Sequence, residues 1–497
     1  MRPKLEYLAR WYLPIILLLA ALPRLGLAWL EHGLNQPDEI FQTLEAAHRW
    51  VYGYGIQAWE FQDGARSWLL PGLIALPWKG LVLLGITDPL VVVPLLRLPF
   101  VALAVYAAMG ASRLARTLAG EMAGNLAALL AAFCPLALLL DFRTTTEAAS
   151  APVVLLAVVA MAETRMARAG AWLALLVFLR PMNAIVGAAA AGSLLLERRF
   201  RESLRLVLGA APVVLAGGLL DWVTWGGPFH HLVEYVKFNW SESGANIFGV
   251  QDAWTYVSVL VSAAPLLALF VLPAAFALVR SVRPARMPMV VALCYLVAHS
   301  ALGHKEPRFL VPILPLLAAL VAAGLTLLVG PWLSKQVPAP RPRTLLLLAG
   351  TVSLFILGTL HARALTYADL HDPRGEPQDP ILFGKRDSIN RLLVEAGKRN
   401  DLCGVLILGL IPNQLFSGGT TYLNRDVLLT SAASPQLWLL MSQAANYAIS
   451  ASRVKPPGWR PVAVRDGVSL FTRPDGCVPL PDKYRPKYQR PRSAQPE

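Results

Sequence analysis

Long apolar runs separated by short arginine-rich loops constrain the fold of this chain more than any other feature. Between residues 11 and 361 there are about eleven such runs, several of them long enough to cross a bilayer. In lipid, a helix satisfies its backbone polar groups internally, so these runs predict membrane-spanning helices. The chain is 56% apolar with a net charge of +14, and we assign its excess arginine to membrane topology and not to nucleic-acid binding. The sequence therefore predicts an all-α polytopic membrane protein.

The orientation depends on two segments. Residues 11–30 are interpreted as an uncleaved first span with a cytoplasmic N-terminus, although Gly26 and Ala28 offer a signal-peptide cleavage site. Residues 67–86 contain two prolines and a lysine; they either cross the membrane or form a re-entrant or interfacial piece of the outer loop. We adopt the second interpretation because it places every basic cluster inside. These clusters are Arg113/Arg116, Arg165/Arg168, Arg198–Arg205, Arg280–Arg286 and Lys335–Arg343.

This orientation places four polar stretches on one outer face, namely 35–66, 141–147, 221–252 and 303–308. Residues 1–361 then form a transmembrane domain with a first outer loop at 31–90. Residues 362–482 are expected to form a small extracytoplasmic α/β domain, with helices at 386–399 and 433–445, a strand at 405–410 and a hairpin at 462–472. Residues 483–497 are rich in proline and arginine and are expected to be disordered.

The chain contains four cysteines, which are too few for a disulfide framework, and no Cys/His spacing indicates a metal site. Cys403 and Cys477 both lie in the C-terminal domain. An oxidising outer compartment would allow them to pair. We therefore expect one disulfide, between Cys403 and Cys477.

The stretch from residue 35 to residue 48 carries three carboxylates and a histidine directly after the first apolar run. One interpretation is structural: Asn35 caps an amphipathic helix on the bilayer surface, and Asp38 and Glu39 lie at its positive end. The other is catalytic, since a carboxylate at the mouth of a membrane protein can act as a general base. The stretch alone does not separate the two.

Three further stretches combine charged, polar and aromatic residues. Residues 221–229 and 238–240 suit either an interfacial aromatic belt or a binding loop. Residues 141–147 place an arginine between two acids, which could be only a cap and an ion pair. Residues 304–309 place His304, Lys305 and Arg308 on the outer side, against the topological preference for cations, and this favours binding of an anionic group.

At these residues the chain resembles glycosyltransferase family twenty-two, which includes the GPI-anchor and N-glycan mannosyltransferases that use dolichyl-phosphate mannose. Residues 36–42, followed by Glu45 and His48, resemble that family's first luminal loop. Residues 304–309 resemble its His-Lys-Glu-Glu-Arg-Phe signature, with Pro307 in place of the second acid. The likeness extends from residue 25 to about residue 316.

The resemblance implies a GT-C fold and an inverting transfer of a sugar from a lipid phosphate. Asp38 matches the family's catalytic acid, and Glu39 would assist it. The cations implied to hold the donor phosphate are His304, Lys305, Arg308, Arg66 and Arg143. The residues implied to contact substrate are Glu60, Asp221, Trp225 and Asn239. No metal and no cofactor are expected, and the outer loops contain no DxD motif of the kind that binds nucleotide sugars.

The expected function is thus an integral-membrane glycosyltransferase that moves a sugar, most simply mannose, from a polyprenyl-phosphate donor to a lipid-linked or glycan acceptor. Its partners would be those two substrates and membrane lipids, with no nucleic acid. Short loops and the lack of an ER-retrieval tail favour a bacterial inner-membrane enzyme with a periplasmic site. A transporter or flippase of a lipid-linked sugar is the alternative; the absence of an internal repeat weighs against it.

Overall fold

The computed structural model describes residues 3–33, 37–241, 244, 246, 249–336, 340–366, 369–370, 387–408, 417–431, 441–450 and 455–479. Of these, the side chains of residues 3–11, 240–241, 333–336, 340–348 and 431 are not described. The expected cap at Asn35, most of the expected helix at 433–445 and the tail at 483–497 therefore lie outside the described residues.

The chain divides into two compact units. Unit 1 comprises Met1–Ala28 and Leu98–Leu382, and unit 2 comprises Trp29–Arg97 and Phe383–Glu497. The first outer loop is thus grouped with the C-terminal segment. This division differs from the expected boundary at residue 361, which followed the change in composition along the chain.

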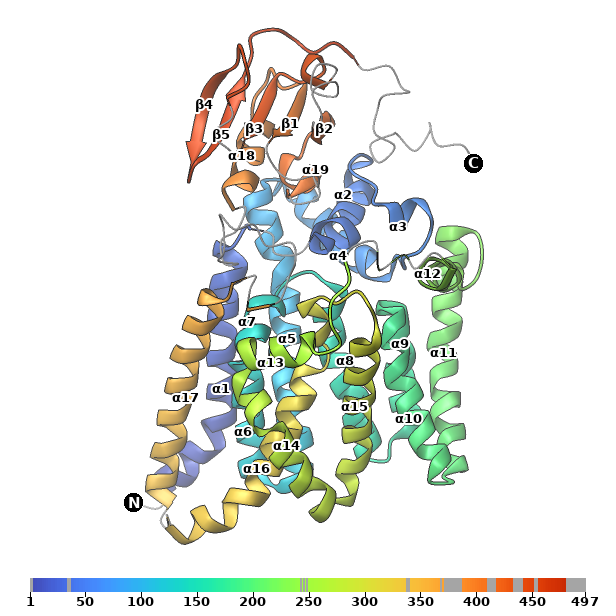
Figure 1. The fold of residues 1–497 in the computed structure, drawn as a ribbon, viewed down its shortest axis with the longest axis vertical. Coiled ribbons are helices and arrows are strands. Elements are labelled where there is room, and N and C mark those ends of the chain that lie inside the picture. The colour runs from blue at the N-terminus through green and yellow to red at the C-terminus, as the bar shows by residue number, and fades with distance from the viewer. Residues whose placement is uncertain are drawn as a thin grey trace. The chain divides into compact units, whose positions relative to one another are not determined.

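Unit 1 is helical (Figure 1). Its helices are α1 (Pro3–Leu30), α5 (Pro89–Ala119), α6 (Glu121–Ala132), α7 (Pro135–Leu140), α8 (Thr146–Ala162), α9 (Met166–Leu179), η2 (Pro181–Asn183), α10 (Ala184–Leu196), α11 (Phe200–Trp225), α12 (His230–Ser241), α13 (Thr255–Ala263), α14 (Pro265–Ser281), η4 (Arg283–Ala285), α15 (Arg286–Ala301), η5 (Pro307–Leu310), α16 (Leu314–Gln336) and α17 (Pro340–Ala364).

Local sequence explains where several of these helices begin and end. The side chain of Thr145 caps α8 by accepting a hydrogen bond from the Ala148 amide. Gly226 ends α11 in a left-handed conformation that costs a glycine little. Helices α9 and α11 can approach closely because Gly170 and Gly209 have no side chain. A Cβ at either position would collide with the backbone of the facing helix.

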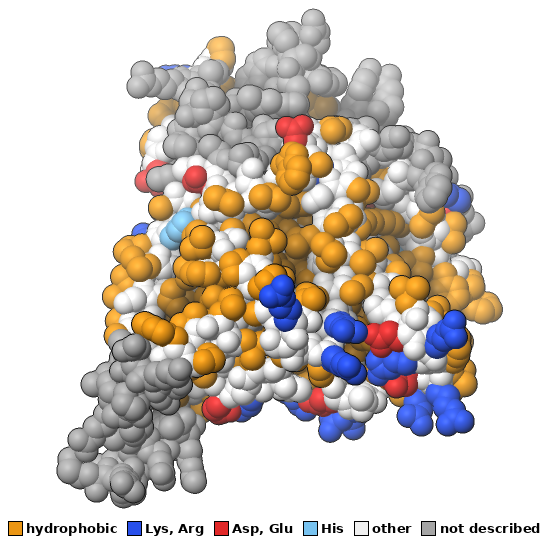
Figure 2. Space-filling view, turned by 60° about the horizontal axis from the view of Figure 1, so that its bottom comes forward, with side chains coloured by type: hydrophobic (Ala, Val, Ile, Leu, Met, Phe, Trp, Pro, Cys, Tyr) orange, Lys and Arg blue, Asp and Glu red, His pale blue; other side chains and the backbone are white. Residues whose placement is uncertain are grey.

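Four helices within the described part of the chain are long and apolar enough to cross a membrane: α1, α5, α11 and α16. Helices α13 and α14 together would make a fifth, with a 113° bend between them. Five shorter apolar helices, including α8 and α9, accompany them. The expectation of several apolar helices is confirmed, whereas the number of about eleven spans stays a prediction. Figure 2 shows a face of the molecule on which hydrophobic side chains cover a broad area.

Unit 2 combines short helices with a five-stranded sheet. Its helices are η1 (Ile40–Leu44), α2 (Glu45–Tyr52), α3 (Trp59–Gln62), α4 (Leu69–Leu83), α18 (Asp387–Gly397) and α19 (Gly419–Leu423). Its strands are β1 (Gly404–Leu408), β2 (Leu428–Ser431), β3 (Tyr447–Ser450), β4 (Arg460–Arg465) and β5 (Val468–Thr472). The order is β2-β1-β3-β5-β4; β1 is parallel to both neighbours, and the other pairs are antiparallel.

The small C-terminal sheet is confirmed, with its hairpin at the expected place. Strands β4 and β5 turn at Asp466 and Gly467, which both adopt positive φ. One face of the sheet packs Leu406, Ala448 and Phe471 into a core with Trp459. A disulfide joins Cys403 to Cys477 beside this sheet.

Candidate active site

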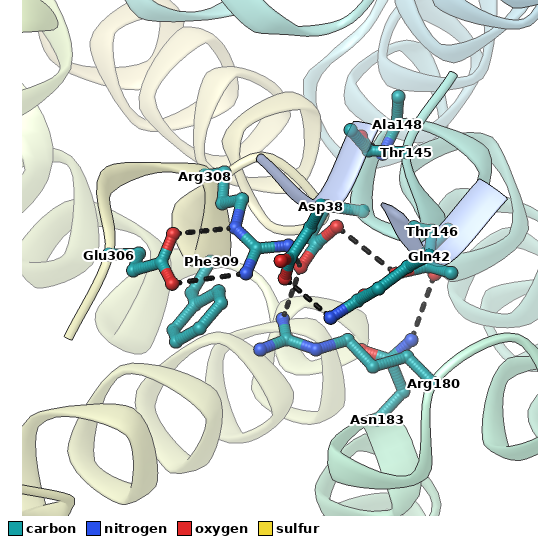
Figure 3. A network of polar contacts seen from close by, with 12 residues as sticks. Asp38, Gln42, Thr145, Thr146, Ala148, Arg180, Asn183, Glu306, Arg308 and Phe309 are labelled. Atoms are coloured by element: carbon teal, nitrogen blue, oxygen red, sulfur yellow. Dashed lines mark hydrogen bonds and ion pairs between the residues drawn. The ribbon is translucent and has the colours of Figure 1, made fainter. Parts of the chain in front are cut away.

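Three polar side chains of unit 2, which we call the acidic cluster, are Asp38, Gln42 and Glu60. Gln42 Nε2 donates to Asp38 Oδ2 at 2.6 Å and to Glu60 Oε1 at 2.9 Å (Figure 3). One amide nitrogen therefore links two carboxylates 22 residues apart in sequence, of which Asp38 is partly exposed and Glu60 buried. The structure thus brings two of the predicted site residues together through a third that the sequence analysis did not single out.

Glu60 differs electrostatically from an ordinary surface acid. Burial raises the pKa of its carboxyl, and the negative charge of Asp38 acts in the same direction, while Arg66 opposes both. Arg66 was expected to bind phosphate, and in the structure its positive charge acts on the Glu60 carboxyl. A carboxyl with a raised pKa beside a second carboxylate is typical of acid–base sites.

Glu39 lies next to Asp38 in sequence but has a different environment. Its side chain is fully buried, and Oε1 pairs with Arg97 Nη2 at 2.7 Å. Arg97 also donates to the carbonyl oxygen of Glu31. Removing either member of such a pair would leave a buried uncompensated charge. This pairing favours a structural role for Glu39 in place of the expected assistance to catalysis.

Two more residues of the first outer loop contact α19 and the residue that ends it. Glu45 accepts hydrogen bonds from the amides of Thr421 at 2.6 Å and Ile56 at 2.9 Å. His48 lies 3.3 Å from Asn424 Oδ1. Burial raises the pKa of Glu45 to about 7 and lowers the pKa of His48 to about 4. Residues 40–49 are all buried, which argues against one of the two interpretations left open for this stretch, an amphipathic helix on the bilayer surface. The polar side chains of Gln42, Glu45 and His48 have partners within the protein.

Unit 1 contains a second group, the arginine cluster, made of Glu147, Arg180, Glu306 and Arg308. Arg308 Nη1 lies 3.0 Å from Glu147 Oε1, and Arg308 Nε lies 2.8 Å from Glu306 Oε2 (Figure 3). All four side chains are buried. The charge of Arg308 is therefore balanced by two carboxylates of the protein. The sequence had suggested a cation that binds an anionic group.

Arg180 is a functional candidate that the sequence analysis missed. It precedes the short helix η2, its Nη1 lies 3.5 Å from Glu147 Oε1, and its guanidinium stacks 4.0 Å from the Phe309 ring centre. Among the described residues, Arg180 Nη1, Asn183 Oδ1 and His299 Nε2 are buried without a hydrogen-bond partner. Such atoms are costly unless a ligand or water satisfies them. The sequence feature that could have identified Arg180 is its position directly before a proline, between two apolar helices.

The remaining cations of the 304–309 motif also have protein partners. Lys305 Nζ donates to the carbonyl oxygens of Gln251, at 2.9 Å, and of Leu302. His304 Nε2 lies 3.0 Å from Glu306 Oε1, and its Nδ1 lies 3.0 Å from the Gly249 carbonyl oxygen. These contacts fix the loop and hold its side chains in place.

Arg143 is buried, with its Nε directed at the carbonyl oxygen of Leu139. The two acids of residues 141–147 form ion pairs with arginines outside this stretch. Asp141 pairs with Arg24 of α1 at 2.7 Å, and Glu147 pairs with Arg180 and Arg308. The first of these pairs is buried and connects α1 to the segment after α7.

The three other expected substrate residues lie near the α11–α12 turn or on α12. Asp221 is fully buried, and its Oδ2 accepts from the backbone amide of His231 and lies 2.6 Å from His231 Nδ1. Trp225 stacks on His230 with 5.9 Å between ring centres. Asn239 donates to the Tyr235 carbonyl oxygen one turn earlier. Asp221 thus stabilises the turn.

No group of three or more His, Cys, Asp or Glu side chains could hold a metal ion within the described part of the chain. The two clusters offer two kinds of chemistry. Asp38 and Glu60 can exchange protons, and the cations of the arginine cluster can stabilise negative charge.

Fold comparison gives the class of protein. ArnT from Cupriavidus metallidurans, solved with undecaprenyl phosphate, superposes with a TM-score of 0.62 at 13% identity, covering 94% of this chain and 99% of that one. The oligosaccharyltransferase AglB from Archaeoglobus fulgidus superposes with a TM-score of 0.53, covering 90% of this chain and 69% of that one, at 13% identity. At such identities the likeness shows the fold alone, which is of the GT-C type.

The chain belongs to the Alg9-like mannosyltransferase family, whose profile matches residues 15–381. GPI mannosyltransferase 3 of Yarrowia lipolytica is 32% identical over 305 residues, 59% of this chain and 58% of that protein. Mannosyltransferase APTG1 of Arabidopsis thaliana is 26% identical over 307 residues, 58% of this chain and 54% of that protein. The matches thus span somewhat more than half the length of these relatives.

Proposed function

We propose that this protein transfers a mannosyl residue from a polyprenyl-phosphate donor to a hydroxyl group of a lipid-linked or glycan acceptor on the outer face of the membrane. Membership of a mannosyltransferase family supports the sugar and the reaction type. The undecaprenyl phosphate bound to ArnT and the dolichol phosphate bound to AglB support a lipid-linked donor. The observation that carries the proposal is the acidic cluster, in which Gln42 holds the partly exposed Asp38.

In this reaction Asp38 accepts the proton of the acceptor hydroxyl. The hydroxyl oxygen then forms a bond to the anomeric carbon, the bond from that carbon to the phosphate oxygen breaks, and the lipid phosphate leaves with the electron pair. Attack from the side opposite the leaving group inverts the anomeric centre. General-base assistance of this kind contributes roughly a hundred- to ten-thousandfold in rate.

The leaving lipid phosphate gains negative charge as the sugar departs, and preorganised cations stabilise that charge. Arg180 and Arg308 share the carboxylates of Glu147 and Glu306 in a buried cluster. A guanidinium group has five donors, so each arginine can bind a phosphate oxygen beside these carboxylates. The unsatisfied Arg180 Nη1 makes this arginine the first candidate to contact the phosphate.

The test is product identification. Purified protein in detergent is incubated with polyprenyl-phosphate mannose carrying a ¹³C-labelled sugar and with a membrane lipid extract, and the products are identified by mass spectrometry. The proposal expects labelled mannose on a new lipid or glycan and release of polyprenyl phosphate. A flippase would instead move the intact donor across liposomes without consuming it, and that result would replace the proposal with the transporter alternative.

A further inference from the structure

A groove in unit 1 lies between α1, α5 and α8 and has a volume of about 400 Å³. This volume is within the range of ligand-binding pockets. Its walls are mainly apolar: Leu13, Tyr106, Met109, Pro152, Leu155 and Leu156 are among the lining residues. Gly110 helps to shape it, because the backbone of α5 there lies directly against the Leu155 side chain.

One end of the groove is polar. Ser112, Arg113 and Arg116 of α5 line it, and Arg116 lies one helical turn after the adjacent residues Ser112 and Arg113. Ser112 is 1% exposed, and its hydroxyl oxygen has no hydrogen-bond partner among the described residues. An unsatisfied buried hydroxyl in a groove with two arginines indicates a ligand with oxygen acceptors.

The groove has the length of one membrane leaflet. Tyr106 and Arg116 are ten residues apart on α5, which corresponds to about 15 Å along the helix axis. This is half of the roughly 30 Å hydrocarbon core. An arginine end at the membrane surface would therefore place the apolar end near the bilayer centre. Arg113 and Arg116 belong to the basic side chains that the positive-inside pattern assigns to the cytoplasmic side, and Figure 2 shows basic side chains gathered on one part of the surface.

We propose that this groove binds an anionic glycerophospholipid of the cytoplasmic leaflet, with one acyl chain along α5 and α8 and the phosphate at Arg113 and Arg116. The positive-inside pattern predicts the cytoplasmic side for this site, whereas mannosyl transfer is proposed for the outer side, so the proposal does not depend on that function.

The existing ion pairs of the two arginines are compatible with this ligand. Arg113 pairs with Glu163 and Arg116 pairs with Glu121 at 2.7 Å, but all four side chains are at least one-fifth exposed. Exposed ion pairs of this kind contribute little to stability and exchange partners readily. A guanidinium also has five hydrogen-bond donors, so it can bind a phosphate and a carboxylate together. Arg165 also pairs with Glu163, so the side chains described at this end of the groove include three cations, Arg113, Arg116 and Arg165, against two carboxylates. The excess favours an anionic over a zwitterionic headgroup.

The proposal is tested by lipid retention. The full chain is reconstituted into nanodiscs that contain equal amounts of phosphatidylglycerol and phosphatidylcholine, transferred to detergent, and analysed by native mass spectrometry for bound lipid. Wild type is expected to retain phosphatidylglycerol in preference to phosphatidylcholine. Arg113→Gln/Arg116→Gln should reduce this preference about thirtyfold, since each basic residue near an anionic headgroup contributes about fivefold.

Arg201→Gln/Arg205→Gln is the matched control, because it removes two exposed arginines that do not line the groove. It should retain the wild-type preference. Met109→Trp keeps the charges but fills the groove, so it should abolish retention of either lipid. This variant also tests the proposal if the double arginine variant does not fold. Three results would overturn the proposal: equal retention of both lipids by wild type, equal loss of preference in the control variant, or polyprenyl phosphate bound in place of phosphatidylglycerol when both are supplied.

Discussion

At the scale of single residues, the proposed reaction depends on how Asp38 is held. A carboxylate on a flexible loop would sample many orientations, and a misplacement of about 1 Å can cost a hundredfold in rate. Gln42 lies one helical turn after Asp38 and donates to its Oδ2 at 2.6 Å, while the same nitrogen is fixed by the buried Glu60. Gln42 is therefore a positioning residue for the base.

Replacing Gln42 should accordingly affect turnover more than binding. We expect Gln42→Ala to lower the single-turnover rate of mannosyl transfer about ten- to a hundredfold with little change in donor affinity, because no contact with the donor is lost. The control is Gln62→Ala, which removes an exposed amide of the same loop that donates only to the Gln57 carbonyl oxygen. An unchanged rate in Gln42→Ala would show that Asp38 does not need this amide.

The neighbouring carboxylates show why residue type alone does not assign a role. Asp38 and Glu39 are adjacent, yet Glu39 forms a buried pair with Arg97, 58 residues away in sequence, whereas Asp38 is partly exposed. The sequence analysis singled out the acidic stretch through its resemblance to the family's first luminal loop. It did not predict which acid pairs with an arginine, because that depends on tertiary contacts between distant segments.

At the scale of elements, η1 and α2 form part of residues 31–90, the segment expected to be the first outer loop. The sequence predicts one continuous helix here from the spacing of apolar residues, but residues 40–44 form a π-helix before α2 begins. A π-turn has one more residue per hydrogen-bonded ring than an α-turn and changes the direction of the side chains that follow, and it is frequent at functional sites. Apolar periodicity does not encode this change.

The contact between α2 and α19 should depend on pH through Glu45. The pKa of Glu45 is about 7 in the folded protein, above its ordinary value of 4.5, so the folded state binds this proton more tightly than the unfolded state. The stabilisation is fully present below pH 4.5 and is lost as the pH rises through 7. A shift of this size corresponds to about 3 kcal/mol at most. His48 stays neutral above pH 6.5 because burial lowers its pKa to about 4, so Glu45 dominates this window.

Hydrogen exchange measures this effect directly. After correction for the intrinsic exchange rate, the amides of Thr421 and Ile56, which both lie at Glu45, should be less protected at pH 8 than at pH 6.5, because the contact loses stability when this buried carboxyl ionises. Glu45→Gln should remove the pH dependence and lower protection at every pH, because its amide nitrogen cannot accept the second hydrogen bond. Equal protection of the wild type at both pH values would contradict the assignment.

At the scale of the whole molecule, the sequence predicted the class of fold and several element positions. The apolar runs, the β4–β5 hairpin and helix α18 follow from local patterns of hydrophobicity and turn residues. Two features did not follow. The grouping of residues 29–97 with 383–497 and the convergence of Glu147, Arg180 and Arg308 each require contacts between segments far apart in sequence. Local patterns carry no information about such pairings.

The central claim is that Asp38 is the general base for mannosyl transfer, and one measurement tests it most directly. Donor affinity and the single-turnover rate are compared for wild type and Asp38→Asn, in which the amide keeps the shape of the side chain but cannot accept a proton. We predict unchanged donor binding and a rate lowered by at least about a hundredfold. Near-normal transfer by Asp38→Asn would contradict the claim and exclude Asp38 as the base.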